Sequence, residues 1–221
     1  MNEDKKIMGL NRNVFFTGLV SLFMDFSSEM IYPLVPVFLS SVLGVNKSLI
    51  GLIEGIAEST ASFLKVFSGY LSDRLNKRKL FLITGYGIST LTRPIIALSC
   101  TWWHVLTFRF IDRFGKGIRG APRDAIIAAS TPPSEMGRAF GFHRAMDTTG
   151  AVLGPAVAYI ILLLCTGNYR LVFWLSMIPG IIAVTIIILF VKEKKTVVEN
   201  KSAPKLSFKN FDWKFKVFIV I

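Results

Sequence analysis

Ionisable side chains lie inside the long apolar stretches of this 221-residue sequence. Asp25 and Glu29 are four residues apart, so they share one face if the segment is helical. Glu54, Glu58 and Lys65 follow with spacings of four and seven and also form one stripe. A charge in hydrocarbon costs roughly 3 kcal/mol on insertion scales, so such residues normally face a protein interior or a water-filled cavity. We therefore expect these side chains to line a polar cavity.

The carboxylates of these two segments outnumber the cations, because Lys65 is the only positive charge within them. Carboxylates that share a low-dielectric site tend to retain a proton between them, which is the behaviour of a reversible proton carrier. The imbalance favours proton or cation coupling over a purely structural set of ion pairs. The residues assigned to this role are Asp25, Glu29, Glu54 and Glu58.

A second group of charges lies further along the chain. One predicted helix carries Arg109, Asp112, Arg113, Lys116, Arg119 and Arg123 within an arc of about 120°, and the next carries Arg144 and Asp147. Two interpretations remain open for these groups. They could form internal ion pairs that lock the helices together, for instance Asp112 with Arg144 or Asp147 with Arg113. They could instead line a substrate cavity together with the acidic residues, and we include Arg109, Asp112, Arg113, Arg144 and Asp147 in that predicted cavity.

These groups must be positioned by membrane-spanning helices. About half of the residues are hydrophobic and 18% are charged, and several apolar stretches exceed the roughly 20 residues needed to cross a bilayer. A soluble domain could not bury them. The sequence therefore predicts an all-α membrane protein with six transmembrane helices, at 14–43, 48–72, 79–100, 102–125, 138–164 and 171–191.

The distribution of basic residues predicts the orientation. The net charge of +12 comes largely from Lys and Arg at the N-terminus, in alternate loops and after the sixth span, whereas the other loops hold only Lys47 and Arg170. Basic loops resist translocation, so the N-terminus is predicted to be cytoplasmic, in a multi-pass protein of the plasma or inner membrane. Nucleic-acid binding is excluded because the cations lie between apolar spans instead of on the face of a soluble domain.

The last part of the sequence changes character. Residues 192–212 form a basic, polar linker suited to lie along anionic membrane lipids, and residues 213–221 are apolar again. We expect a six-helix bundle at 1–191, a cytoplasmic linker at 192–212 and the start of a truncated seventh helix at 213–221. Two cysteines and two histidines lack metal-ligand spacing, so no metal, no cofactor and no enzymatic activity are expected.

Prolines and glycines mark special points in two helices. Pro33 and Pro36 are expected to break the first helix just beyond Glu29, because each lacks the amide hydrogen of the helical ladder. Gly150 and Gly154 share one face of the fifth span and permit close helix contact, with Pro155 directly after them.

The loop after the second span reads Gly69-Tyr-Leu-Ser-Asp73-Arg74-Leu-Asn76-Lys-Arg78-Lys. It resembles the signature G-x-L-x-D-R-x-G-R-K of the major facilitator superfamily, with Asn76 in place of a glycine. The resemblance implies that Asp73 and Arg74 belong to a cytoplasmic gating loop that includes Gly69 and Arg78. It also implies Arg119 or Arg123, at the end of the fourth span, as partners of Asp73.

Two further segments resemble signatures of the same superfamily. Residues 150–155 are similar to the helix-five motif G-x-x-x-G-P of antiporters, and Arg109 with Gly115 and Gly117 is similar to the helix-four motif R-x-x-x-G-x-G-x-G, in which Arg113 replaces a glycine. The resemblance implies one half of a twelve-helix bundle whose C-terminal six-helix half is missing. It also implies secondary transport of a small solute by alternating access, with proton-coupled efflux or antiport. The alternative is a truncated fragment or structural half-protein that transports nothing without a partner.

Overall fold

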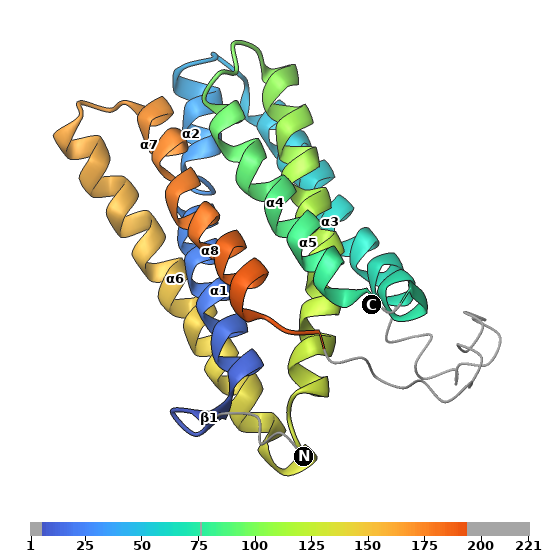
Figure 1. The fold of residues 1–221 in the computed structure, drawn as a ribbon. Coiled ribbons are helices and arrows are strands. Elements are labelled where there is room, and N and C mark those ends of the chain that lie inside the picture. Colours follow the sequence, from blue (N-terminus) through green and yellow to red (C-terminus); the bar gives the residue numbers. More distant parts are fainter. Residues whose placement is uncertain (1–5, 76, 194–221) are drawn as a thin grey trace.

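The computed structural model describes residues 6–75 and 77–193, as a bundle of helices (Figure 1). The expected linker, apart from its first two residues, and the expected seventh helix lie outside the described residues. A short hairpin of β1 (Lys6–Ile7) and β2 (Leu10–Asn11) precedes the bundle. The helices are α1 (Arg12–Glu29), α2 (Leu34–Ser41), α3 (Lys47–Leu75), α4 (Arg78–Ile96), α5 (Trp102–Ala129), α6 (Met136–Leu164), α7 (Tyr169–Leu175) and α8 (Met177–Phe190), with a 3₁₀ turn at Pro133–Glu135.

Each of the six predicted spans coincides with one helix or with two consecutive helices. The first is divided into α1 and α2 by a turn at residues 30–33, just beyond Glu29 as predicted; Pro33 ends this turn, whereas Pro36 lies inside the first turn of α2 and does not interrupt it. The sixth is divided into α7 and α8 at Ser176. Three helical segments of the described chain are long and apolar enough to cross a membrane, namely Arg12–Ser41, Pro133–Leu164 and Tyr169–Phe190. The other three predicted spans, α3, α4 and α5, do not meet that criterion, and α3 and α5 carry the charged stripes.

The surface of the bundle has the polarity of a protein in lipid. Phe63 of α3, Trp103 of α5 and Leu164 of α6 are 69%, 60% and 78% exposed, whereas Arg109 and Arg113 of α5 are buried. Apolar side chains thus face outward while charged ones face inward, and α3 and α5 share this arrangement with the three apolar segments. Such a surface suits contact with lipid hydrocarbon.

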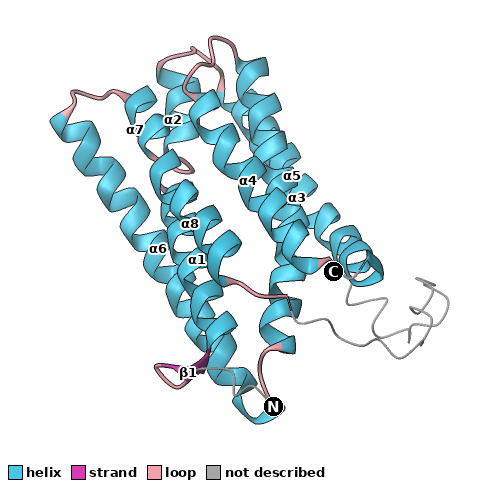
Figure 2. Cartoon of the chain, viewed as in Figure 1, coloured by secondary structure: helices cyan, strands magenta, loops and turns pink. Residues whose placement is uncertain are grey.

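The helices form two groups that α8 connects (Figures 1 and 2). In one group α6 packs against α1, and in the other α3 and α4 both pack against α5. The helix α8 packs against both α1 and α4. A buried apolar cluster that includes Val20 and Met24 of α1, Tyr86 of α4, and Ala183 and Ile187 of α8 fills this junction.

One end of the bundle is fastened by Asn13, at the start of α1. Its side-chain amide donates to Ser130 Oγ at 3.0 Å, directly after α5, and to the Lys192 carbonyl at 2.8 Å, after α8. Lys79 Nζ, at the start of α4, donates to the Ile188 carbonyl at 2.9 Å. The start of α1, the loop before α4, and the ends of α5 and α8 therefore lie at the same end, as six crossings of a membrane would require.

The opposite end is closed by Arg170. Its guanidinium donates to the carbonyls of Ala97 at 2.5 Å and Ser99 at 3.0 Å, and it lies 5.6 Å from the centre of the Phe38 ring. This one side chain connects the start of α7 with the ends of α4 and α2. The turn before α7 contains Gly167 with φ of 74°, a left-handed conformation that glycine adopts without strain.

Gly150 and Gly154 of α6 lie where this helix packs against α1. A Cβ atom on Gly154 would lie 2.8 Å from the Phe26 carbonyl oxygen and 2.9 Å from the Met30 nitrogen. The two backbones approach so closely that only glycine fits. Gly141, on the same helix, has nothing within 4 Å of such an atom.

These two glycines give a matched pair of variants. We expect Gly154→Ala to destabilise the bundle by roughly 1–3 kcal/mol, because the added methyl group meets backbone that cannot move aside. Gly141→Ala should be neutral or stabilising by roughly 0.5–1 kcal/mol, because it only replaces a poor helix former. Thermal unfolding of the detergent-solubilised protein measures both, and equal effects of the two variants would contradict the packing described for α6 on α1.

Candidate functional site

A polar cavity of about 300 Å³ opens between α1, α3, α5 and α6. It contains four carboxylates and five cations, together with the buried Tyr86 of α4 and several small residues. The charged lining residues are Asp25, Glu29, Glu58, Lys65, Lys116, Arg119, Arg123, Arg144 and Asp147. Seven of these nine were assigned to the predicted cavity or gating loop from the sequence, and they come from four different helices.

Several charged residues of the cavity have no counter-ion. Asp25 and Glu29 of α1 and Lys65 and Lys116 of α3 and α5 take part in none of the ion pairs within 4.0 Å that the described residues form. Arg119 also lacks a carboxylate partner. Its guanidinium donates to Ser89 Oγ at 2.7 Å and lies 4.4 Å from the centre of the Tyr86 ring.

Glu54 and Glu58 of α3, by contrast, are paired with arginines of α5. Glu54 accepts two hydrogen bonds from the Arg109 guanidinium, and Glu58 Oε1 lies 2.9 Å from Arg113 Nη2. The Tyr32 ring lies 5.2 and 5.1 Å from these two guanidinium carbons. Lys65 is the only cation within the two acidic segments themselves, but α5 supplies arginine partners to two of the four carboxylates, because α3 packs directly against the basic face of α5.

Asp147 of α6 is buried among groups from two helices. It accepts a hydrogen bond from the Ser21 hydroxyl of α1. Its second oxygen lies 3.5 Å from His143 Nδ1 and 3.9 Å from Arg144 Nη1, one turn earlier on its own helix. The pair expected between Asp147 and Arg113 does not form, because Arg113 is engaged by Glu58.

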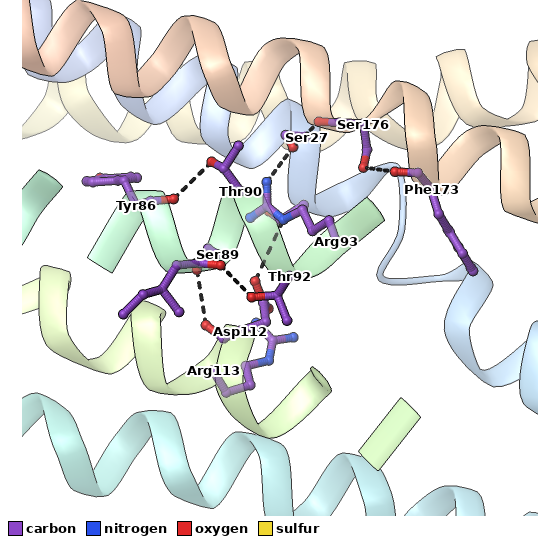
Figure 3. A network of polar contacts seen from close by, with 12 residues as sticks. Ser27, Tyr86, Ser89, Thr90, Thr92, Arg93, Asp112, Arg113, Phe173 and Ser176 are labelled. Atoms are coloured by element: carbon purple, nitrogen blue, oxygen red, sulfur yellow. Dashed lines mark hydrogen bonds and ion pairs between the residues drawn. The ribbon is translucent and has the colours of Figure 1, made fainter. Parts of the chain in front are cut away.

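Asp112 of α5 belongs to a separate, fully buried network (Figure 3). Arg93 of α4 is 2% exposed, and its Nε lies 3.7 Å from Asp112 Oδ1. The same guanidinium donates to Ser27 Oγ of α1, which in turn donates to the Ser176 carbonyl at the break between α7 and α8. Asp112 thus pairs with Arg93, and not with Arg144 as one interpretation of the sequence suggested. The network ties together four of the six predicted spans.

The motif of the predicted gating loop makes its contacts within the loop itself. Asp73, whose side chain is 59% exposed, pairs with Arg78 at 2.8 Å. Arg74 is exposed in the last turn of α3, and Asn76 lies outside the described residues. The expected partners of Asp73 are engaged elsewhere, Arg119 with Ser89 and Arg123 with Asp124 at 3.0 Å. Gly69 lies where α3 approaches α5, since a Cβ there would be 3.1 Å from Ala121 Cβ.

Several residues of these clusters could not be assigned to a site from the sequence. Lys65 and Lys116 were already visible as members of charged stripes. Arg93 was visible as a cation inside a span, but nothing in the sequence showed which helix it faces. Ser21 and Ser27 could not be recognised as members of a polar cluster from the sequence, because serine is common in membrane helices. Among the described residues, no group of three or more His, Cys, Asp or Glu could hold a metal ion.

The sequence profile of the Major Facilitator Superfamily matches residues 17–218. The chain belongs to this superfamily. Its members are multi-pass membrane transporters, so the cavity described above lies in a protein of that class. The chain is also 38% identical to an uncharacterized MFS-type transporter of Methanocaldococcus jannaschii. The alignment covers 96% of this chain and 52% of that transporter.

Other relatives include efflux proteins. The chain is 24% identical to the quinolone resistance protein NorA of Staphylococcus aureus, over 95% of this chain and 53% of that protein. It is 24% identical to the multidrug resistance protein MdtH of Proteus mirabilis, over 73% of this chain and 40% of that protein. The chain therefore spans about half the length of the curated relatives it matches.

Solved structures show the same fold. A crystal structure of a POT family transporter superimposes with a TM-score of 0.80 at 16% identity, over 98% of this chain and 45% of the other. The human organic anion transporter MFSD10 superimposes with a TM-score of 0.68 at 20% identity, over 82% of this chain and 47% of the other. At these identities the likeness establishes the arrangement of helices and nothing about the solute.

The buried pair of Arg93 and Asp112 supports a stability prediction. Asp112→Asn should destabilise the protein by roughly 3–5 kcal/mol, because the Arg93 charge would stay buried without compensation. Replacing both partners with apolar residues, Arg93→Met with Asp112→Leu, should cost less than Asp112→Asn alone. The matched control Asp73→Asn removes an exposed pair and should cost about 0–1 kcal/mol.

Thermal unfolding of the three variants in detergent gives the comparison. A loss for Asp112→Asn no larger than that for Asp73→Asn would show that the buried network contributes little to stability.

Proposed function

We propose that this chain forms the N-terminal six-helix half of a secondary transporter that moves a small solute by alternating access, with proton-coupled efflux or antiport. The observation that carries the proposal is the polar cavity between α1, α3, α5 and α6, in which Asp25 and Glu29 have no ion-pair partner among the described residues. Charged groups inside membrane segments typically mark the path of a solute or proton. In this proposal α3, α4 and α5 span the membrane with their charges facing the cavity or the buried networks.

The carboxylates differ in how readily they could exchange a proton. Protonation of Glu54 or Glu58 would leave a buried arginine without its partner, which is costly. Protonation of Asp25 or Glu29 breaks no ion pair. We therefore assign the coupling role first to Asp25 and Glu29, with Asp147 as a neighbour on the facing helix. Glu58 is assigned to the wall of the cavity, and Glu54 to the ion pair with Arg109 that holds α3 against α5.

The direction of transport is proposed from the relatives and the orientation from the charge distribution. Two relatives are named as quinolone and multidrug resistance proteins, which supports efflux of organic solutes. The basic loops all belong to the end of the bundle that Asn13 fastens, which supports a cytoplasmic N-terminus in the cell membrane. At that same end, the exposed carboxylate of Asp73 is available to a second half, in keeping with a gating role for its loop.

Transport in proteoliposomes with and without a pH gradient tests the coupling. The wild-type protein should move solute faster with the gradient. Asp25→Asn should transport at the same rate with and without it, because an amide cannot exchange a proton. Solute movement that ignores the gradient in the wild-type protein would remove the coupling from the proposal.

A matched control is Glu135→Gln, which makes the same change of carboxyl to amide in a surface pair with Lys6. We expect it to keep the gradient dependence of the wild-type protein. If Asp25→Asn also keeps it, then Asp25 is not the coupling residue.

The alternative is a membrane protein that moves nothing by itself and needs a partner half. The same assay separates the two. Absence of solute movement by the folded chain, followed by transport when a second six-helix half is added, would identify a half-protein.

A further inference from the structure

The charged cavity residues that have no ion-pair partner among the described residues are divided by sign between helices. The helix α1 contributes only carboxylates, Asp25 and Glu29, whereas α3 and α5 contribute Lys65 and Lys116 without counter-ions. Arg119 of α5 adds a third positive charge without a carboxylate partner. The remaining charges of the lining are paired, Glu58 with Arg113, Arg123 with Asp124, and Asp147 with Arg144. What is left is one negative wall and one positive wall.

We propose that this cavity binds a small zwitterionic solute, with its cationic group at Asp25 and Glu29 and its anionic group at Lys65 and Lys116. The inference rests on the proposed function and specifies its substrate class. The two walls belong to one cavity, yet no ion pair within 4.0 Å joins them among the described residues. A solute that carries both charges completes both sets of ion pairs at once.

A solute with a single charge is expected to bind less well. It would satisfy one wall and displace water from the other, and a desolvated charge without a partner is costly. The lining also includes the small residues Ala61, Ser62, Gly117 and Gly120.

The cations of the positive wall differ in mobility, which divides their roles. Arg119 is buried and held by Ser89 and the Tyr86 ring, so its charge is fixed in place. Lys65 and Lys116 are exposed and line the cavity, and their ammonium groups make no hydrogen bond or ion pair within the described structure. The two lysines can therefore turn toward an anionic group, while Arg119 contributes a fixed positive potential behind them.

The experiment compares three forms of each of three compounds. Leucine, phenylalanine and the dipeptide alanylalanine are each tested as the free zwitterion, as the carboxamide and as the N-acetylated acid. Binding to the purified protein is measured by ligand-induced thermal shift, and transport by uptake into proteoliposomes. We expect at least one zwitterion to bind about tenfold more tightly than both of its singly charged forms, which corresponds to about 1.4 kcal/mol.

Two variants test which wall of the cavity binds the amine of the solute and which binds its carboxylate. Lys116→Gln should remove the preference for the zwitterion over the carboxamide and keep the preference over the N-acetylated acid. Asp25→Asn should do the reverse, because it removes a partner of the amine. Lys47→Gln, an exposed lysine at the start of α3 and outside the cavity, should leave both preferences unchanged.

The outcomes distinguish this inference from the function on which it rests. Gradient-driven transport of only singly charged compounds, or binding of none of the nine, overturns the zwitterion site and leaves secondary transport standing where flux is seen. Equal weakening of all three forms in both variants also overturns it, because the walls would then not recognise separate groups. Selective binding of a zwitterion without any transport, also when a second six-helix half is added, supports the site and contradicts the proposed function.

Discussion

The cost of holding charge away from water governs the internal arrangement of this bundle. The helix α5 brings seven charged residues into the bundle, and all but Asp124, which pairs with Arg123 of the same helix, are met by groups from a neighbouring helix or by the cavity. Glutamates of α3 meet Arg109 and Arg113, and α4 supplies Arg93 to Asp112 and Ser89 with Tyr86 to Arg119. Breaking such a partnership leaves a buried charge uncompensated, which is far more costly than losing a surface pair. The position of α5 relative to α3 and α4 is therefore tightly specified.

The same constraint separates fixed charges from available ones. Where α3 and α4 pack closely against α5, the charged residues form ion pairs that hold the helices together. Where α1 and α6 face α3 and α5 across the cavity, Asp25, Glu29, Lys65 and Lys116 have no ion-pair partner among the described residues. Close packing of α6 on α1 through glycine, and of α8 on both groups, keeps these two sides in a defined relation. Some charged groups of the cavity lining thus lack a partner of opposite charge among the described residues. A polar solute would supply that partner.

The proposed coupling and the proposed substrate class use the same carboxylates. A proton bound by Asp25 or Glu29 removes the negative charge that would hold a cationic group of the solute. Proton and solute would then compete for the carboxylates of α1. Antiport requires such competition, because each species must leave before the other binds. The paired glutamates of α3 cannot take part in this competition without exposing an arginine, which is why the proposal places it on α1.

The sequence alone indicated the class of the protein and most of the charged residues in the cavity lining. Hydrophobic length gave the six helical segments, Pro33 gave the break between α1 and α2, and charges inside apolar spans gave Asp25, Glu29, Asp147 and the basic face of α5. These features are local, since they depend on composition and helical periodicity along one segment. The partner of each charge was decided only by the tertiary structure. Asp112 pairs with Arg93 instead of Arg144, Glu54 and Glu58 pair with arginines of α5, and Asp73 pairs within its own loop. These contacts depend on which faces of distant helices meet. The periodicity of a single segment contains no information about that.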